Sequence, residues 1–293
     1  LPGSKPNSRN ISSDHQEVRS CRFHSPLPTW LASCAYRSRM RSRSRSACTL
    51  RPARTNSHAA GSVVSSSLTL CHNGRIFDYV ASADELCVFD PVQKQFVVAS
   101  QSRRIQTIVT FDEIRHHTET RRQRTEEYLQ EIAGRSEAGE SRELQFIRFQ
   151  LNPEFRQSFD AARNTLMLAS PALTYRVELS RWDDAEQVER CLAWRDWTAR
   201  LNSVLHPDNL FPEPRLEMNR AIRERGNFLP VVVELDRRPA VMTVLRAEHQ
   251  LTAGLSDDDH TRIARWESLL KSAELEVVPL RRYQQSALVS RSR

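Results

Sequence analysis

The sequence predicts an α+β fold, in which an antiparallel β meander packs with about five helices and follows a disordered basic arm. Two observations lead to this fold class. Short apolar runs follow one another closely between residues 66 and 109, with turn residues rather than helices between them, which favours antiparallel pairing. Longer segments with helical spacing of apolar residues come later in the chain. A single domain is therefore expected over residues 66–280.

The arm is predicted over residues 1–65. It contains many Ser, Arg, Pro and Asn residues and few large apolar ones, so folding would bury too little apolar surface to offset the loss of chain entropy. It also holds the charge, because residues 1–64 contain eleven basic and two acidic residues, whereas the whole chain has a net charge of +7. The domain that follows is close to neutral, and the basic balance does not describe one of its faces.

The meander begins with the clearest hairpin signal in the chain. Leu68–His72 and Arg75–Val80 flank Asn73-Gly74, a pair that accepts the positive φ angles of a tight turn. Three more strands are expected at residues 86–89, 96–98 and 104–109. Thr110-Phe-Asp-Glu113 is a capping box, and it predicts a mostly exposed helix up to Ala133.

The remaining elements follow from the spacing of apolar residues and from Gly and Pro punctuation. They are a helix at 140–151, strands at 165–169 and 173–179, helices at 183–205 and 214–225, strands at 229–235 and 240–251, a helix from 256 and an apolar segment at 275–278. The helix at 183–205 carries one stripe of Cys191, Trp194, Thr198, Leu201 and Leu205, which is typical of a buried face. Residues 281–293 contain four arginines and no acid and are predicted to be a basic disordered tail.

No catalytic, cofactor-binding or metal-binding residue is predicted, and no cofactor. The sequence contains no P-loop, dinucleotide glycine fingerprint, nucleophile elbow or H-E-x-x-H motif. Glu113, His116 and His117 could share a helix face toward a metal, but a third ligand is missing nearby, so they are interpreted as exposed surface residues. Asp257–His260 is interpreted as the acidic first turn of a helix.

Two further groups of residues are candidate sites. Glu248 and His249 are neighbours on an expected strand, so their side chains point to opposite faces, which argues against a cooperating pair. Four tryptophans could line a ligand cavity, although helical spacing favours core packing for Trp194 and Trp266. The four are Trp182, Trp194, Trp197 and Trp266.

The six cysteines include no C-x-x-C pair and predict no disulfide framework. Cys71 and Cys87 are expected to be buried thiols, with a disulfide between them as the alternative if their strands are neighbours. Leu31-Ala-Ser-Cys34 is similar to a lipoprotein signal, but the residues before it contain two prolines and no apolar run. The sequence therefore shows no clear export signal, and no apolar run long enough to cross a membrane.

Several segments together resemble a group of uncharacterised secreted bacterial proteins. They include Asn73–Tyr79, Phe89–Pro91, Thr110–Glu113, Trp197–Asn202 and Leu245–His249, and the resemblance covers nearly all of residues 66–285 and none of the arm. In strand layout this group is similar to the half-barrels of periplasmic lipoprotein carriers, which hold acyl chains in an apolar concavity. The resemblance implies a half-barrel-like sheet and an envelope or extracellular location, and it carries over no functional residues.

The leading hypothesis is a non-enzymatic envelope or secreted protein that binds an apolar ligand or a partner protein. The first alternative is a nucleic-acid-associated protein that uses its basic arm. The second alternative is an enzyme whose site assembles from residues far apart in the sequence.

Overall fold

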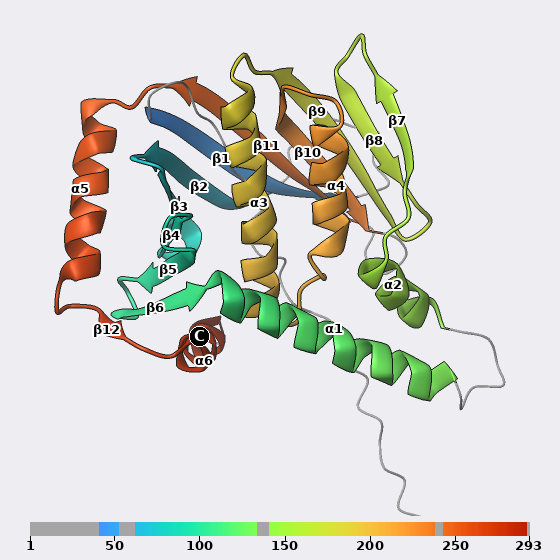
Figure 1. Cartoon of the computed structure of the whole chain (residues 1–293), viewed down its shortest axis with the longest axis horizontal. Coiled ribbons are helices and arrows are strands. Elements are labelled where there is room, and N and C mark those ends of the chain that lie inside the picture. The colour runs from blue at the N-terminus through green and yellow to red at the C-terminus, as the bar shows by residue number, and fades with distance from the viewer. Residues whose placement is uncertain (1–40, 53–61, 134–140, 238–242, 292–293) are drawn as a thin grey trace, which may run out of the picture.

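A computed structural model describes residues 41–52, 62–133, 141–237 and 243–291. Within these ranges the chain has an α+β fold with six α-helices and one twelve-stranded sheet (Figure 1). The strand order is β12-β6-β5-β4-β3-β2-β1-β11-β10-β9-β8-β7. All neighbouring strands pair antiparallel except β12 and β6, which pair parallel. The predicted α+β class is confirmed.

The first half of the sheet contains the predicted meander. Its strands are β1 (Arg41–Pro52), β2 (Ser62–His72), β3 (Arg75–Val80), β4 (Glu85–Asp90), β5 (Gln95–Ser100) and β6 (Ile105–Thr110). At the first hairpin Asn73 and Gly74 have φ angles of 50° and 75°, the left-handed conformations that a two-residue turn requires. β7 to β11 face the viewer in Figure 1, whereas β3 to β6 turn away, so the sheet is strongly curved.

The second half of the sheet begins at its other edge, with β7, and reaches β1 through β11. Its strands are β7 (Arg156–Asp160), β8 (Thr165–Ala169), β9 (Leu173–Arg181), β10 (Phe228–Arg237), β11 (Thr243–Ala253) and β12 (Glu276–Val277). β7 was not predicted, since Phe159 is its one large apolar residue. It forms because its backbone pairs with β8 at the edge of the sheet.

β1 corrects the expected arm, which ends earlier than residue 65. Residues 41–52 lie in the middle of the sheet, where Ser46 pairs with Ser67 of β2 on one side and with His249 of β11 on the other. A strand between two others bonds its backbone on both sides, so pairing outweighs a low apolar content. The alternation of Arg and Ser in residues 41–46 also has the period of a strand. Residues 1–40 and 53–61 of the arm lie outside the described residues.

The six helices are α1 (Phe111–Ala133), α2 (Arg142–Leu151), α3 (Ala185–Leu205), α4 (Glu213–Arg223), α5 (Asp257–Lys271) and α6 (Leu280–Arg291). α1 starts at the predicted capping box, in which the Glu113 carboxylate accepts from the Thr110 backbone N–H at 2.8 Å. Of its residues only Phe111, Ile114 and Leu129 are buried. The predicted, mostly exposed helix is confirmed.

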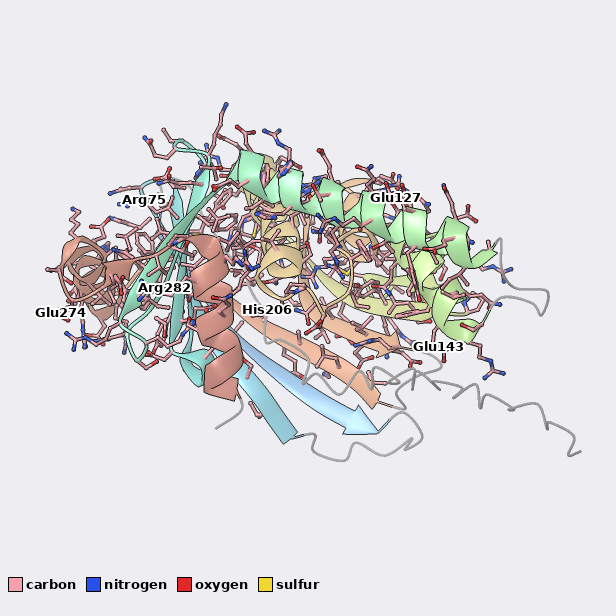
Figure 2. All side chains as sticks on the ribbon, turned by 90° about the horizontal axis from the view of Figure 1, so that it is seen from below. Arg75, Glu127, Glu143, His206, Glu274 and Arg282 are labelled. Carbon is pink, nitrogen blue, oxygen red and sulfur yellow. The ribbon has the colours of Figure 1, made fainter. Side chains whose placement is uncertain are left out.

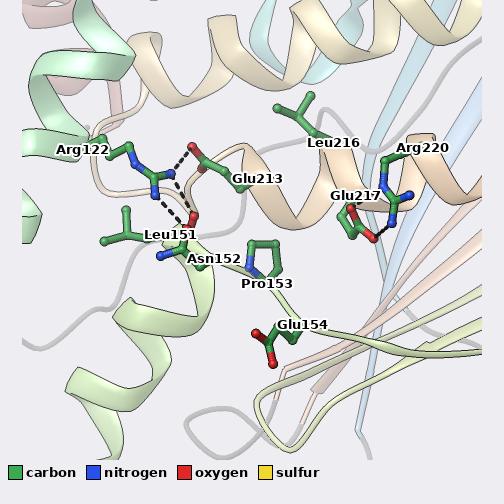
Figure 3. Close-up of a pocket in the computed structure, with 9 residues that line it drawn as sticks. All are labelled: Arg122, Leu151, Asn152, Pro153, Glu154, Glu213, Leu216, Glu217 and Arg220. Carbon is green, nitrogen blue, oxygen red and sulfur yellow. Dashed lines mark hydrogen bonds and ion pairs between the residues drawn. The ribbon is translucent and has the colours of Figure 1, made fainter.

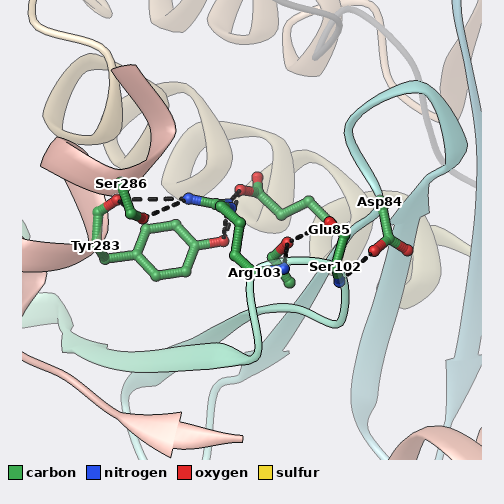
Figure 4. Close-up of polar contacts among 7 residues, drawn as sticks. Asp84, Glu85, Ser102, Arg103, Tyr283 and Ser286 are labelled. Carbon is green, nitrogen blue, oxygen red and sulfur yellow. Dashed lines mark hydrogen bonds and ion pairs between the residues drawn. The ribbon is translucent and has the colours of Figure 1, made fainter. Parts of the chain in front are cut away.

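α6 corrects the predicted disordered tail, because residues 280–291 are helical. Tyr283 is 2% exposed, and its hydroxyl donates to Glu85 Oε2 at 2.6 Å and accepts from Arg103 Nη2 at 2.7 Å (Figure 4). Arg103 Nη1 also donates to Ser286 Oγ at 2.9 Å. A short arginine-rich segment has little helical stability by itself; these contacts with β4 and the turn before β6 supply it.

Helices cover both faces of the sheet. We call the face under α3 and α4 the inner face. Ile76, Cys87 and Tyr175 belong to the core packed there. Phe77 and Leu86 alternate with them and pack with Ile263 and Trp266 of α5 on the outer face. Charged side chains such as Glu127 and Glu274 lie on the periphery (Figure 2). The inner face is thus the enclosed side of the fold.

Candidate functional site

The two histidines of α1 lie on the protein surface. His116 and His117 are exposed, with ring centroids 6.0 Å apart, and Glu113 is engaged in the capping box. In the described ranges no group of three His, Cys, Asp or Glu residues is placed to hold a metal ion. The interpretation of these residues as surface residues is confirmed.

The acidic run before α5 is a helix cap. Asp259 is buried, and its Oδ2 accepts from the Ser256 backbone N–H at 3.0 Å and from Ser256 Oγ at 2.8 Å. The Asp259 N–H in turn donates to Ser256 Oγ at 3.3 Å. These reciprocal bonds satisfy the free N–H groups of the first turn, as the sequence predicted.

The four tryptophans pack against other side chains. Trp194 is buried in the main core, Trp197 stacks on Phe111 with centroids 3.8 Å apart, and Trp266 lies beside Phe77. Trp182 donates its indole N–H to Gln187. The core interpretation of Trp194 and Trp266 is confirmed, and Trp182 and Trp197 also contribute to packing.

Glu248 and His249 separate as the strand period predicted. Glu248 is exposed and accepts from Arg246 Nε at 2.6 Å. His249 is 5% exposed and lies on the inner face, where the charges of Arg195 and Arg215 act on it. The structure therefore joins His249 to two residues of α3 and α4 that the sequence reasoning had not singled out.

Arg195 is the centre of this inner-face cluster. Arg195 is 3% exposed, and within the described ranges none of its three guanidinium nitrogens has a hydrogen-bond partner. Burial lowers the pKa of Arg195 well below its usual value, and the charge of Arg215 lowers it further, whereas Asp78 of β3 raises it. A buried guanidinium without a hydrogen-bonding acceptor is unfavourable.

Arg215 and His249 complete the cluster from α4 and β11. Arg215 Nη1 is buried and has no hydrogen-bond partner among the described residues, and burial lowers the pKa of this side chain. Burial, followed by the charges of Arg195 and Arg215, holds the pKa of His249 well below its ordinary value. His249 is therefore a neutral imidazole beside two arginines.

Neutral polar groups also lie buried on this side of the sheet. Thr198 follows Arg195 by one helical turn on α3, and Ser67 lies on the same face of β2 as the inner-face residue Cys71, four residues further along the strand. Their hydroxyl oxygens are buried and lack a hydrogen-bond partner in the described part of the chain. Native interiors rarely leave polar groups unpaired, and we call this set the inner polar cluster. It comprises Ser67, Arg195, Thr198 and Arg215, and the buried His249 lies with them.

One sequence signal could have found this cluster. Arg195 follows Cys191 by four residues and precedes Thr198 by three, so it belongs to the face that the apolar stripe predicted to be buried. A charged residue inside such a stripe is unusual. Its companions on α4 and β11 had no comparable signal, because helical and strand periods relate residues within one element only.

A hollow lies on the surface, where α1, the end of α2 and the start of α4 meet (Figure 3). It has a volume of about 440 Å³. Its charged groups are engaged with each other: Arg122 donates to the Leu151 carbonyl and to Asn152 Oδ1, each at 2.8 Å, and Arg220 Nε donates to Glu217 at 2.8 Å. Because its arginines already have partners, this hollow offers a ligand less than the inner polar cluster does.

The cysteines divide into two chemical states. Cys71 and Cys87 are buried free thiols, as predicted, and burial together with Asp78 and Glu85 raises the pKa of Cys87 well above its ordinary value. Cys191 is disulfide-bonded, which the sequence did not predict. The residue that it bonds is not among those whose side chains are described, and neither is the lipobox-like segment 31–34.

Over the described residues, no helix has both the length and the apolar character needed to span a membrane. The sequence matches no protein-family model and no curated protein. The site is therefore interpreted from its own chemistry.

Proposed function

We propose that this chain is a non-enzymatic binding protein that holds a small ligand between the inner face of the sheet and α3. The inner polar cluster supports this proposal: its members come from β2, α3 and α4, with His249 of β11 beside them. Buried polar atoms of Ser67, Arg195, Thr198 and Arg215 have no hydrogen-bond partner in the described part of the chain. A bound ligand would supply partners that the fold itself leaves out.

The side chains on the inner face indicate which kind of ligand the site would bind. Core side chains from α3 and α4, among them Leu192, Trp194 and Met218, pack against the apolar part of this face. An open apolar concavity that holds whole acyl chains is therefore less favoured than a ligand with a polar group, which the inner polar cluster would bind. This keeps the ligand-binding hypothesis from the sequence and changes the kind of ligand.

An envelope or extracellular location is part of the proposal. The resemblance to secreted bacterial proteins supports it, and so does the disulfide at Cys191, because disulfides persist mainly in oxidising compartments.

The two alternatives have less support. Residues 41–52 of the basic arm form a central strand, which removes them from a flexible chain that could follow a nucleic acid. His249 does meet other titratable groups, but they are two arginines, and burial together with their charges keeps the imidazole neutral. We favour binding over proton transfer, since a neutral imidazole with a strongly lowered pKa is a weak base.

Native mass spectrometry of the full chain tests the proposal. We expect the purified protein to carry a small molecule that is released on denaturation. Thr198→Leu, which places a larger apolar side chain in the cluster, should lose that molecule, whereas the matched Thr261→Leu variant on exposed α5 should keep it. The absence of any bound mass in all three proteins, or equal retention by Thr198→Leu, would contradict the proposal.

A further inference from the structure

We infer that the group bound by the inner polar cluster is an oxyanion, a carboxylate or a phosphate, held by the guanidinium of Arg195 with Arg215 and His249 beside it. This inference rests on the proposed function, since it identifies the ligand chemistry of the same site. It starts from the charge of Arg195, which a guanidinium keeps under ordinary conditions.

Three other partly buried arginines in the described structure have acidic partners. Arg103 contacts Glu85 at 2.9 Å, Arg223 contacts Asp196 at 2.8 Å, and Arg246 contacts Glu234 at 2.6 Å. An acid thus compensates the charge of each of these three arginines. Arg195 is more buried than any of these and has no hydrogen-bond partner within the described ranges. Its missing acceptor is the part that a ligand would supply.

The acids near Arg195 do not replace this acceptor. Asp196, its neighbour in sequence, accepts from Asn219 Nδ2 at 2.6 Å and pairs with Arg223. Asp78 of β3 acts on Arg195 through its charge, and its Oδ1 accepts from Thr69 Oγ1 at 2.6 Å. With Arg215 adding a second positive charge, the surroundings of the cluster favour an anion.

The donors have the geometry that oxyanions use. A guanidinium presents parallel N–H groups that match two oxygens of a carboxylate or phosphate. The Thr198 hydroxyl, one turn along α3, and Arg215 Nη1 offer further donors to the same region. The imidazole of His249, whose pKa burial and the two arginines hold low, adds no third positive charge.

Isothermal titration of the full chain with three probes tests the inference: sodium phosphate, sodium octanoate and neutral 1-octanol. We expect phosphate or octanoate to bind and octanol to bind far more weakly. Tighter binding of octanoate than of phosphate would assign the anion to an amphiphile, and the reverse order would assign it to a free phosphate. Both of these orders support the oxyanion.

Substitutions on α3 distinguish a loss of anion affinity caused by removing the Arg195 charge from one caused by misfolding. Arg195→Gln should lower the affinity at least about tenfold, as expected when a hydrogen bond to a charged group is lost. Arg195→Lys keeps the positive charge but not the parallel N–H groups of the guanidinium, so it should lose less affinity than Arg195→Gln. The matched Arg190→Gln variant, on the exposed face of the same helix, should bind like the parent, and the melting temperatures of all variants show whether they fold.

The outcomes distinguish the two proposals. Equal affinity of Arg195→Gln and the parent, or octanol binding as tightly as octanoate, would overturn the oxyanion and leave the binding site in place. A neutral molecule found by native mass spectrometry would do the same. Failure of all three probes to bind, together with no bound mass in the purified protein, would overturn both.

Discussion

The attachment of α6 to the sheet can be tested by removing one hydroxyl group. Tyr283→Phe deletes the oxygen that donates to Glu85 at 2.6 Å and accepts from Arg103 at 2.7 Å. The ring stays in the core, and the Arg103 guanidinium keeps its position 4.3 Å from the ring centroid. The variant therefore isolates the two hydrogen bonds of the hydroxyl from the packing of the side chain.

The expected loss follows from the charges of the two partners. A hydrogen bond to a charged group contributes about 1.5–3 kcal/mol. Glu85 keeps its contact with Arg103 at 2.9 Å in the variant, so the carboxylate is not left alone and the two losses do not add fully. We expect the free energy of unfolding to fall by about 2–3 kcal/mol. Tyr283→Ala, which also opens a cavity, should cost about 3–5 kcal/mol.

Urea denaturation followed by circular dichroism measures these changes. Tyr128→Phe on exposed α1 is the matched control, and its effect should stay within about 0.5 kcal/mol. If Tyr283→Phe changed the stability no more than this control, the hydroxyl would not stabilise α6. If a chain ending at residue 279 were as stable as the full chain, α6 would not be part of the fold.

Three further predictions concern other parts of the molecule. Burial, with Arg195 and Arg215, holds the pKa of His249 in the native state well below its value in the unfolded chain. The native state therefore binds fewer protons than the unfolded state at low pH. As the pH is lowered from about 6.5, the free energy of unfolding should decrease by up to about 1.4 kcal/mol per pH unit. Urea midpoints at pH 7.5 and 5.5 measure this slope, and His249→Asn should flatten it; an unchanged slope would disprove the assignment. Peptide mapping without reductant should recover Cys191 in a disulfide-linked peptide, and alkylation of Cys191 in the unreduced native protein would speak against the bond. Ser256→Ala removes the cap of α5 and should cost about 0.5–2 kcal/mol in thermal unfolding; no change would mean that the cap is dispensable.

Local signals in the sequence located most of the elements. Asn73-Gly74, the box at Thr110 and the cap at Ser256 each act through φ angles or hydrogen bonds within about four residues, so they can be read without the fold. The stripe from Cys191 to Leu205 likewise marked the buried face of α3. These features determined the α+β class and the order of most elements from residue 66 onward, except β7 and α6.

Tertiary structure alone decided the parts that depend on distant partners. β1 is a strand because β2 and β11 bond its backbone from both sides, and α6 is a helix because Glu85 and Arg103 hold Tyr283. β11 is far from β1 in the sequence, Glu85 and Arg103 lie 198 and 180 residues before Tyr283, and neither segment carries enough apolar surface to fold by itself.

The inner polar cluster shows the same division. By itself the sequence placed Arg195 within the predicted helix at 183–205 and His249 within an expected strand, with Glu248 turned to the other face. Only the packing of α3 and α4 over the inner face brought Arg195, Arg215 and His249 together. Helical and strand periods determine which way a side chain points on its own element, whereas the meeting of charges from three elements depends on how the sheet curves and which helices cover it.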